Sequence, residues 1–191
     1  MAMDANSVNI EKKPYHHGDL RAALIVEGLR LLSERDADSL SLREVARSVG
    51  VSAPSVYRHF PDKEALMTAL AEEGLKRLAA TQHEAADAAG GGEAGFAATG
   101  RAYVRFALAN PALFRLIFTS PVIARYRQNN PAPDEAMNFL LANAAAAVGA
   151  DRESAEARGA AIQAWALVHG MAMLMLDGQL PVDDRIIDAI R

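Results

Sequence analysis

Polar side chains that could hydrogen-bond to another molecule gather between residues 52 and 63. Ser52 and Ser55 carry hydroxyls, Arg58 carries a guanidinium, and small residues such as Ala53 lie between them. Small residues let a helix approach a surface closely, while hydroxyls and arginine bond to base edges and phosphate oxygens. This pattern suits a helix laid in the major groove of DNA. An ordinary helical corner, the alternative, does not explain so many polar groups on one short helix.

Two short helices joined by a tight turn must position this stretch. The first begins after Ser41, which is expected to be its N-cap, and Glu44 stands at the spacing of a capping box. Gly50 ends that helix, because a turn there favours a positive φ. Ser52 is expected to cap the second helix, and Phe60-Pro61-Asp62 closes it. A turn of this length is typical of a helix–turn–helix unit.

The rest of the chain also reads as helical, since alanine and leucine dominate and no stretch alternates apolar with polar residues. We therefore expect an all-α fold of about nine helices. A three-helix N-terminal helix–turn–helix unit is followed by a larger C-terminal helical bundle. Besides the short helix after Ser52, the expected helices span about 18–35, 42–49, 63–88, 93–109, 112–118, 134–148, 152–177 and 183–190. Residues 122–126 are expected to lead into a loop.

Composition and charge exclude several classes of protein. The chain has no cysteine, which excludes a disulfide scaffold, a thiolate metal site and a cysteine nucleophile. Residues 12–63 carry nine Lys/Arg and seven Asp/Glu, whereas residues 64–191 carry eleven and fifteen, so the net charge of −4 hides a mildly basic N-terminal part. Residues 1–19 do not resemble a secretory signal, and the apolar run 160–176 is short for a membrane-spanning helix. We expect a cytoplasmic protein with no membrane partner.

A helical enzyme is the weaker alternative. The paired Glu-x-x-His motifs of a di-iron bundle are missing from the sequence, and no glycine-rich phosphate loop follows a strand. Thr119 and Ser120 have no evident His/Asp pair. We therefore assign no catalytic residue, no metal site and no cofactor.

The stretches HGDLRAALIVEGLRLL and SLREVARSVGVSAPSVYRHFPDKEAL, within Tyr15–Leu78, are similar to the DNA-binding domain of the TetR family of transcriptional repressors. Tyr57, Phe60, Lys63 and Leu66 stand in the arrangement of that family's signature. The second half of the chain resembles a branch named for a Trp-His-Gly motif. Shorter matches carry this second resemblance, namely NPALFRLIF at 110–118 and WALVHG at 165–170.

The resemblance implies a homodimeric repressor that binds a palindromic DNA operator and is released by a small-molecule effector. It implies three regions: a flexible basic arm at 1–15, a helix–turn–helix DNA-binding domain at 16–62, and a ligand-binding and dimerisation domain at 63–191. A transcriptional activator, or a DNA-binding protein without ligand release, remains possible on the same fold. The arm is open to two interpretations, a DNA-contacting segment or a solvated tail.

Individual DNA-contacting residues follow from the same resemblance. Those expected at base edges or the adjacent backbone are Arg43, Ser52, Ala53, Ser55 and Arg58. Those expected at phosphates are Tyr57, His59 and Lys63. The position of Lys63 at a helix N-terminus agrees with this role, because the helix dipole also favours a phosphate there. Tyr57 has an alternative role as an aromatic residue at the edge of the core.

The C-terminal half offers candidates for an effector pocket and for a dimer seam. Large adaptable apolar groups indicate an apolar or aromatic effector, with filling of the core as the alternative for each. The pocket candidates are Tyr103, Phe106, Phe114, Phe118, Phe139, Trp165 and His169. Small and apolar residues of the helix at 152–177 are expected at a two-fold seam. The seam candidates are Ala160, Ala164, Val168, Met171 and Met175.

Overall fold

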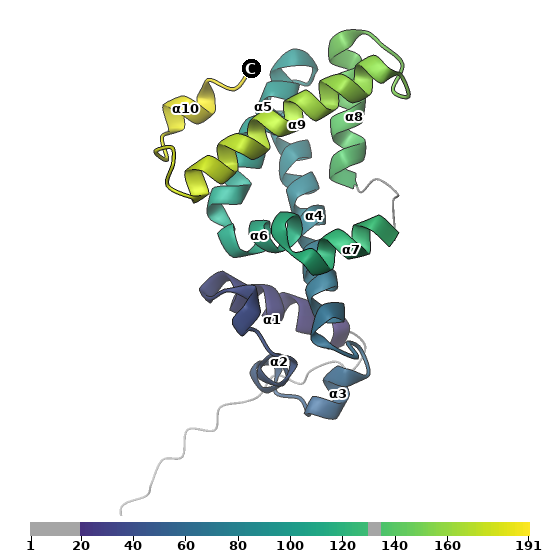
Figure 1. Cartoon of the computed structure of the whole chain (residues 1–191), viewed down its shortest axis with the longest axis vertical. Helices are drawn as coiled ribbons and strands as arrows, with labels where there is room; N and C mark the ends of the chain where they lie inside the picture. Colours follow the sequence, from purple (N-terminus) through teal and green to yellow (C-terminus); the bar gives the residue numbers. More distant parts are fainter. Residues whose placement is uncertain (1–19, 130–134) are drawn as a thin grey trace, which may run out of the picture.

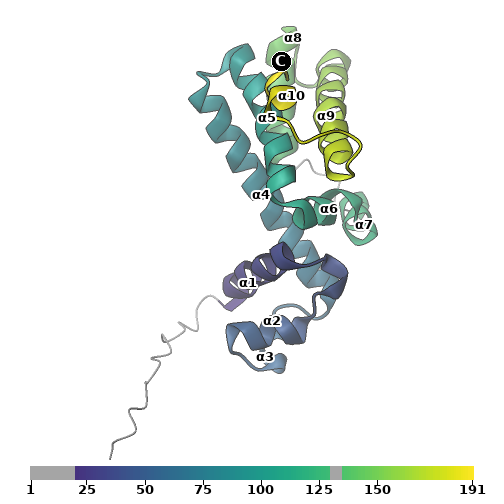
Figure 2. The same ribbon diagram turned by 90° about the vertical axis from the view of Figure 1, so that its left-hand side faces the viewer.

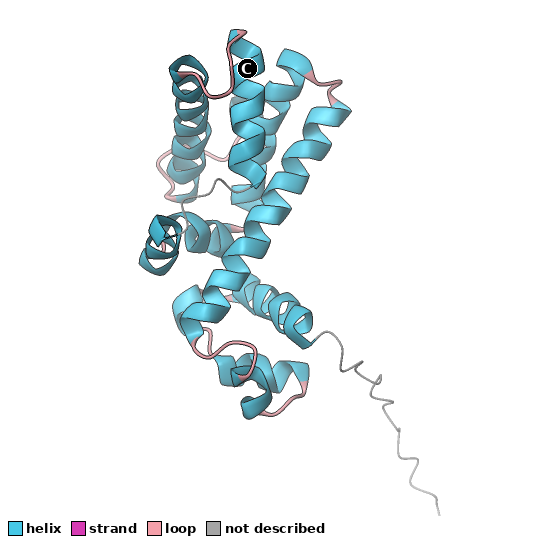
Figure 3. Ribbon diagram, turned by 90° about the vertical axis from the view of Figure 1, so that its right-hand side faces the viewer, coloured by secondary structure: helices cyan, strands magenta, loops and turns pink. Residues whose placement is uncertain are grey.

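The computed structural model describes residues 20–129 and 135–191, and within them all regular secondary structure is helical, as expected (Figures 1 and 3). The expected basic arm at 1–15 and the expected helix start at residue 18 lie outside this part of the chain. The described residues contain ten α-helices and one 3-10 helix. They are α1 (Leu20–Glu34), η1 (Ala37–Ser39), α2 (Leu42–Val49), α3 (Ala53–Tyr57), α4 (Lys63–Ala88), α5 (Gly92–Ala109), α6 (Pro111–Thr119), α7 (Pro121–Asn129), α8 (Glu135–Val148), α9 (Ala155–Leu176) and α10 (Asp184–Asp188).

α2 and α3 form the predicted helix–turn–helix. The Ser41 side chain accepts a hydrogen bond from the backbone N–H of Glu44, and Gly50 has a φ of 80°, so both ends of α2 are confirmed. Ser52 occupies the N-cap position of α3, but its hydroxyl makes no bond to a backbone N–H. It lies 2.8 Å from the Ser55 hydroxyl instead. Ser52 therefore stands at the expected N-cap position, but the expected bond from its side chain is wrong, because its hydroxyl pairs with the Ser55 hydroxyl and not with a backbone N–H of α3.

α4 connects the three-helix head to the bundle. It begins at the predicted residue, because the Asp62 carboxylate accepts a hydrogen bond from the Ala65 N–H at 2.8 Å. Its 26 residues extend about 39 Å at 1.5 Å per residue. Figures 1 and 2 show α4 running from α1–α3 at one end into the bundle with α5, α8 and α9. Where α6 crosses it, a Cβ on Gly74 would lie 2.8 Å from side-chain atoms of both Leu113 and Ile117. The missing side chain at Gly74 therefore permits the close approach of the two helices.

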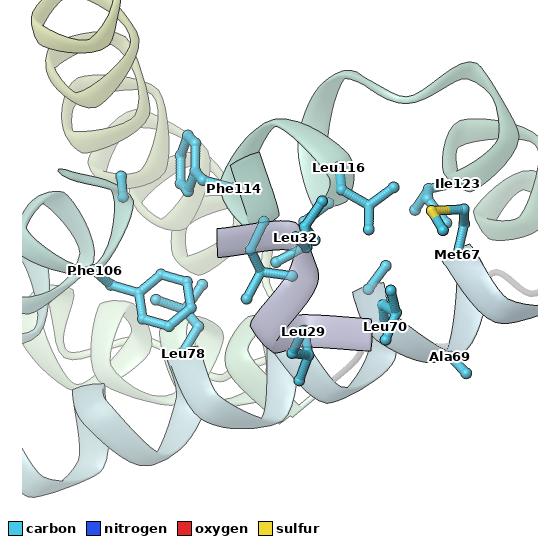
Figure 4. Packing of buried hydrophobic residues seen from close by; sticks show 14 of the residues in the cluster. Leu29, Leu32, Met67, Ala69, Leu70, Leu78, Phe106, Phe114, Leu116 and Ile123 are labelled. Carbon is cyan, nitrogen blue, oxygen red and sulfur yellow. The ribbon is translucent and has the colours of Figure 1, made fainter. Parts of the chain in front are cut away.

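One hydrophobic core runs through the head and the bundle. Figure 4 shows Leu29 and Leu32 of α1 packed among Leu70 of α4 and Leu116 of α6. The core thus continues across the boundary expected between residues 62 and 63. Packed side chains therefore join the head to the bundle at α1, α4 and α6.

Residues expected to lead into a loop form a helix, α7. Pro121 starts it, as proline is tolerated in a first helical turn. Ile123 is only 2% exposed and belongs to the shared core, and the Tyr126 hydroxyl donates to the Glu72 carboxylate at 2.6 Å. Tertiary packing against α4 therefore stabilises a helix whose local sequence is mostly polar. This helix raises the total in the described residues to ten, against about nine expected.

Candidate DNA-reading surface and effector cavity

α3 presents a polar face to solvent and an apolar anchor to the core. Val56 is fully buried, while Ser52, Arg58 and His59 are exposed and Tyr57 is 44% exposed. A helix of five residues has little stability of its own, so the burial of Val56 holds it in place. The exposure of Tyr57 places its ring at the surface, where its hydroxyl can reach another molecule.

A short chain of hydrogen bonds organises the polar face of α3. The hydroxyls of Ser52 and Ser55 are 2.8 Å apart, and the Arg58 guanidinium donates to the Ser55 hydroxyl at 3.4 Å. These three residues stand three apart in sequence and so lie on one side of the helix. Of the other residues expected at DNA, Ala53 is half-buried and Arg43 projects from α2 into solvent.

Lys63 has a partner that the sequence did not predict. Its ammonium donates a hydrogen bond of 2.6 Å to the backbone carbonyl of Asp38, in η1. The residue still stands at the N-terminus of α4, where unpaired N–H groups and the helix dipole favour an anion. Lys63 thus holds the turn after α1 against the start of α4, immediately beside α3.

The bundle holds a cavity of about 100 Å³ that is partly open to solvent. A ligand can therefore extend beyond this volume, which is of the same order as the apolar cavity of about 150 Å³ that holds a benzene molecule. Its walls come from α4, α5, α6, α8, α9 and the residues after α10. The principal lining residues are Leu75, Leu78, Gln82, Phe96, Thr99, Tyr103, Phe118, Leu140, Ala164, Trp165, Val168 and Ile190.

Three of the seven residues expected at an effector pocket line this cavity, namely Tyr103, Phe118 and Trp165. The other four lie elsewhere in the bundle. Phe106 and Phe114 are buried in the core, and the ring of Phe139 packs on that of His83 with centroids 3.7 Å apart. His169 lies behind Tyr103 and packs on the ring of Phe114.

Hydrogen bonds link the aromatic wall of the cavity. The indole N–H of Trp165 donates to the Tyr103 hydroxyl at 3.1 Å, and that hydroxyl lies 2.9 Å from Nδ1 of His169. Burial lowers the pKa of the His169 imidazole below its ordinary value, which favours the neutral ring. A neutral ring with its proton on Nε2 leaves Nδ1 to accept from Tyr103. The three side chains therefore form an uncharged unit joined by two hydrogen bonds.

The segment around α10 closes one side of the cavity. The guanidinium of Arg101 donates to the backbone carbonyl of Ile190 at 2.8 Å, and Arg105 forms an ion pair of 2.6 Å with Asp188. Both arginines lie on α5. Because Ile190 lines the cavity and is 5% exposed, these contacts fix that wall.

Several lining residues were not among the candidates. Gln82 is the most informative of them, since it is polar and only 7% exposed. It follows Leu75 and Leu78 at spacings of seven and four residues, which puts all three on one face of α4. This spacing from two apolar residues could have indicated that Gln82 faces the core. A glutamine in a helix rich in charged residues, however, usually suggests a side chain that points to solvent.

The side of α9 that faces solvent is not the side that carries the residues expected at a dimer seam. Of the five seam candidates, Val168 and Met175 are buried in the chain's own core, Ala164 lines the cavity, and Ala160 and Met171 are half-buried. The large apolar residues that α9 exposes are Ile162 (63%), Leu167 (57%) and Leu174 (45%).

α9 is also the one helix in the described part of the chain that is long and apolar enough to cross a membrane, by length and composition. Only 22% of its most apolar window is buried. For metals, no group of three or more His, Asp or Glu side chains suited to an ion occurs within residues 20–129 and 135–191.

Two models of known protein families match the chain. The one described as "Bacterial regulatory proteins, tetR family" matches residues 24–70, which include α2 and α3. The one described as "Tetracyclin repressor-like, C-terminal domain" matches residues 96–190, which include most of the bundle. Neither description names the Trp-His-Gly branch.

Curated relatives agree with the N-terminal match. An HTH-type transcriptional regulator of Mycobacterium tuberculosis is 33% identical over 105 residues, which are 54% of this chain and 45% of that protein. The class D tetracycline repressor of Escherichia coli is 40% identical over 57 residues, 30% of this chain and 26% of the repressor. The chain therefore spans less than half the length of these curated relatives.

Solved structures match over more of the chain. A protein of unknown function from Rhodococcus sp. RHA1 is 33% identical with a TM-score of 0.73, covering 93% of this chain and 94% of that one. A tetR-family transcriptional regulator from Streptomyces coelicolor has a TM-score of 0.67 at 22% identity, covering 89% and 78%, and shares the fold.

Proposed function

Because the chain belongs to the TetR family of bacterial transcriptional regulators, we propose that it is a cytoplasmic repressor released from its operator by a small effector. It acts as a homodimer on a palindromic site, and it is a regulator without a catalytic role. The observation that carries the proposal is the position of α4. This helix starts beside α3 at Lys63 and lines the cavity with Leu75, Leu78 and Gln82.

In this proposal α3 lies in the major groove. Ser52, Ala53, Ser55 and Arg58 face base edges, with Arg43 on the adjacent backbone, because these groups share the solvent side of the helix–turn–helix. Tyr57, His59 and Lys63 bond to phosphates. Phosphate contacts set the register of the protein on the duplex, whereas the base contacts select the sequence.

Effector and DNA are coupled through α4. Gln82 lies nineteen residues after Lys63, which is about 28 Å along the helix. A ligand that pushes the cavity end of α4 therefore displaces its other end, and the close contact of Gly74 with α6 passes the same shift to the core under α1. In a dimer, this displacement changes the separation of the two α3 helices and weakens operator binding.

The homodimer is supported by the exposed apolar side of α9. Ile162, Leu167 and Leu174 are each at least 45% exposed, although α9 is the most apolar long helix of the described chain. A soluble protein that leaves such a face uncovered has an interaction site there, and a second copy offers the same face about a two-fold axis. We place the dimer seam on this side of α9, with Ala160 and Met171 at its edge.

Selection from random DNA tests the proposal. We expect an inverted repeat whose half-sites lie about one helical turn apart, or a multiple of it. In vitro transcription from a promoter carrying that repeat should then fall when the protein is added. Recovery of a single asymmetric site, or an increase in transcription, would contradict the dimeric repressor.

A further inference from the structure

Gln82 is a buried polar side chain without a hydrogen-bond partner among residues 20–129 and 135–191. It is 7% exposed, lies in the wall of the cavity, and makes no side-chain hydrogen bond within the described chain. A carboxamide offers two donors and an acceptor oxygen, and leaving these unsatisfied in a buried site is costly. Such a group in a native structure requires an explanation, and a ligand that bonds to it is one.

The other inner polar groups of the cavity already have partners. The Thr99 hydroxyl donates to the backbone carbonyl of Phe96 at 2.7 Å, and the Trp165 N–H donates to Tyr103. Arg191, the charged residue among the described lining, is exposed at the rim. Gln82 therefore supplies the hydrogen-bonding capacity that the inner wall has left for a ligand.

We propose that Gln82 selects the effector, which is an uncharged molecule about the size of a benzene ring with one polar group that bonds to the carboxamide. Its apolar part packs on Phe96, Tyr103 and Trp165. The proposal rests on the proposed function, in which this cavity receives the effector.

The residues that line the cavity favour a ligand that is uncharged and that carries one polar group. An ion would be buried without an opposite charge on the inner wall, which strongly disfavours a carboxylate or an ammonium group. A purely apolar molecule would fill the space but leave Gln82 unsatisfied. A neutral amide, alcohol or carbonyl compound avoids both penalties.

Three probes of one shape test the proposal: benzamide, toluene and benzoate. Their dissociation constants are measured by ligand-observed NMR on the full chain and on Gln82→Met, whose side chain has similar length but no amide. We expect the native chain to bind benzamide about tenfold more tightly than toluene, with benzoate weakest. The Gln82→Met variant should bind toluene at least as tightly as benzamide.

One variant serves as the control. Gln179→Met makes the same chemical change at an exposed position away from the cavity. It should keep the preference for benzamide. If Gln82→Met does not fold, Gln82→Leu takes its place.

The proposal is overturned if benzoate binds most tightly, if none of the probes binds, or if the Gln82 variant keeps the native preference. Operator affinity, measured separately by fluorescence anisotropy, distinguishes this failure from failure of the proposed function. If benzamide binds through Gln82 but operator affinity does not change, the assignment of Gln82 stands and effector release fails. If benzamide releases the operator equally well from the native chain and from Gln82→Met, then effector release stands and the assignment of Gln82 fails.

Discussion

Replacing Gly74 by alanine tests whether α4 and α6 approach each other as closely as the structure places them. The new Cβ would lie 2.8 Å from side-chain carbons of Leu113 and Ile117, which are 6% and 1% exposed and have little room to move. Gly159 on α9 provides a matched control within one chain, because a Cβ there would meet nothing within 4 Å. Since Gly159 lies on the side of α9 proposed as the dimer seam, both substitutions are also compared in the Leu167→Glu background. Both glycines lie within helices, so each substitution gains the same helix propensity. The two variants therefore differ only in how the new methyl group packs against the rest of the chain.

The expected magnitudes follow from two opposing effects. Alanine in place of glycine within a helix adds about 1 kcal/mol to the free energy of unfolding. Inserting a methyl group into a filled core lowers it by about 1–3 kcal/mol. We therefore expect Gly74→Ala to be destabilised by about 0–2 kcal/mol and Gly159→Ala to be stabilised by up to about 1 kcal/mol.

Thermal and urea unfolding of the two variants measure this difference. For a chain of this length, each kcal/mol shifts Tm by about 2–4 °C. Measurements at two protein concentrations show whether association contributes, because Tm then depends on concentration. If Gly74→Ala raises Tm as much as Gly159→Ala does, then α4 and α6 do not approach closely at Gly74, and the coupling argued through that contact is refuted.

Three further predictions concern DNA, association and pH. Lys63→Ala should weaken binding to all DNA sequences by a similar factor, whereas Arg58→Ala should also relax sequence preference, as measured by anisotropy on matched and mutated sites. Equal loss of specificity in both variants would contradict their different roles. Leu167→Glu should yield a monomer in size-exclusion chromatography, because a charge cannot be buried at an apolar seam. A dimer that persists in this variant would place the seam elsewhere. Burial lowers the pKa of His169, so the unfolded chain binds the proton more readily and stability should fall as pH decreases below the ordinary value of about 6.5. The His169→Gln variant should show a shallower loss of Tm between about pH 7.5 and 5, and an unchanged slope would mean that other groups cause it.

Helix ends determined by local side chains could be predicted from the sequence. Ser41 and Asp62 cap the helices that follow them, and Gly50 takes the left-handed conformation that ends α2. Each of these features depends on residues within four positions along the chain. The all-α fold and the helix–turn–helix were predictable for the same reason.

Features that depend on distant contacts were not predictable. α7 forms because Ile123 reaches the core beneath it, which its neighbours in sequence do not indicate. Aromatic residues suggested a pocket, but whether a ring lines a cavity or fills the core depends on helix rotation, and Phe114 lies in the core whereas Phe118 lines the cavity. Small residues on α9 suggested an outer seam, yet Ala164 faces inward.

If Lys63 bonds to a phosphate as proposed, its hydrogen bond to the Asp38 carbonyl has a consequence for DNA binding. A free lysine loses rotamer freedom when a phosphate immobilises it, and this loss opposes binding. Here the ammonium is already held at 2.6 Å from a fixed oxygen before any DNA arrives. Part of the ordering has therefore taken place during folding, and in the proposed complex a phosphate would need only to share or replace one oxygen partner. In that complex, a lysine that is already ordered would bind a correctly placed phosphate at a smaller cost in conformational entropy than a freely moving lysine.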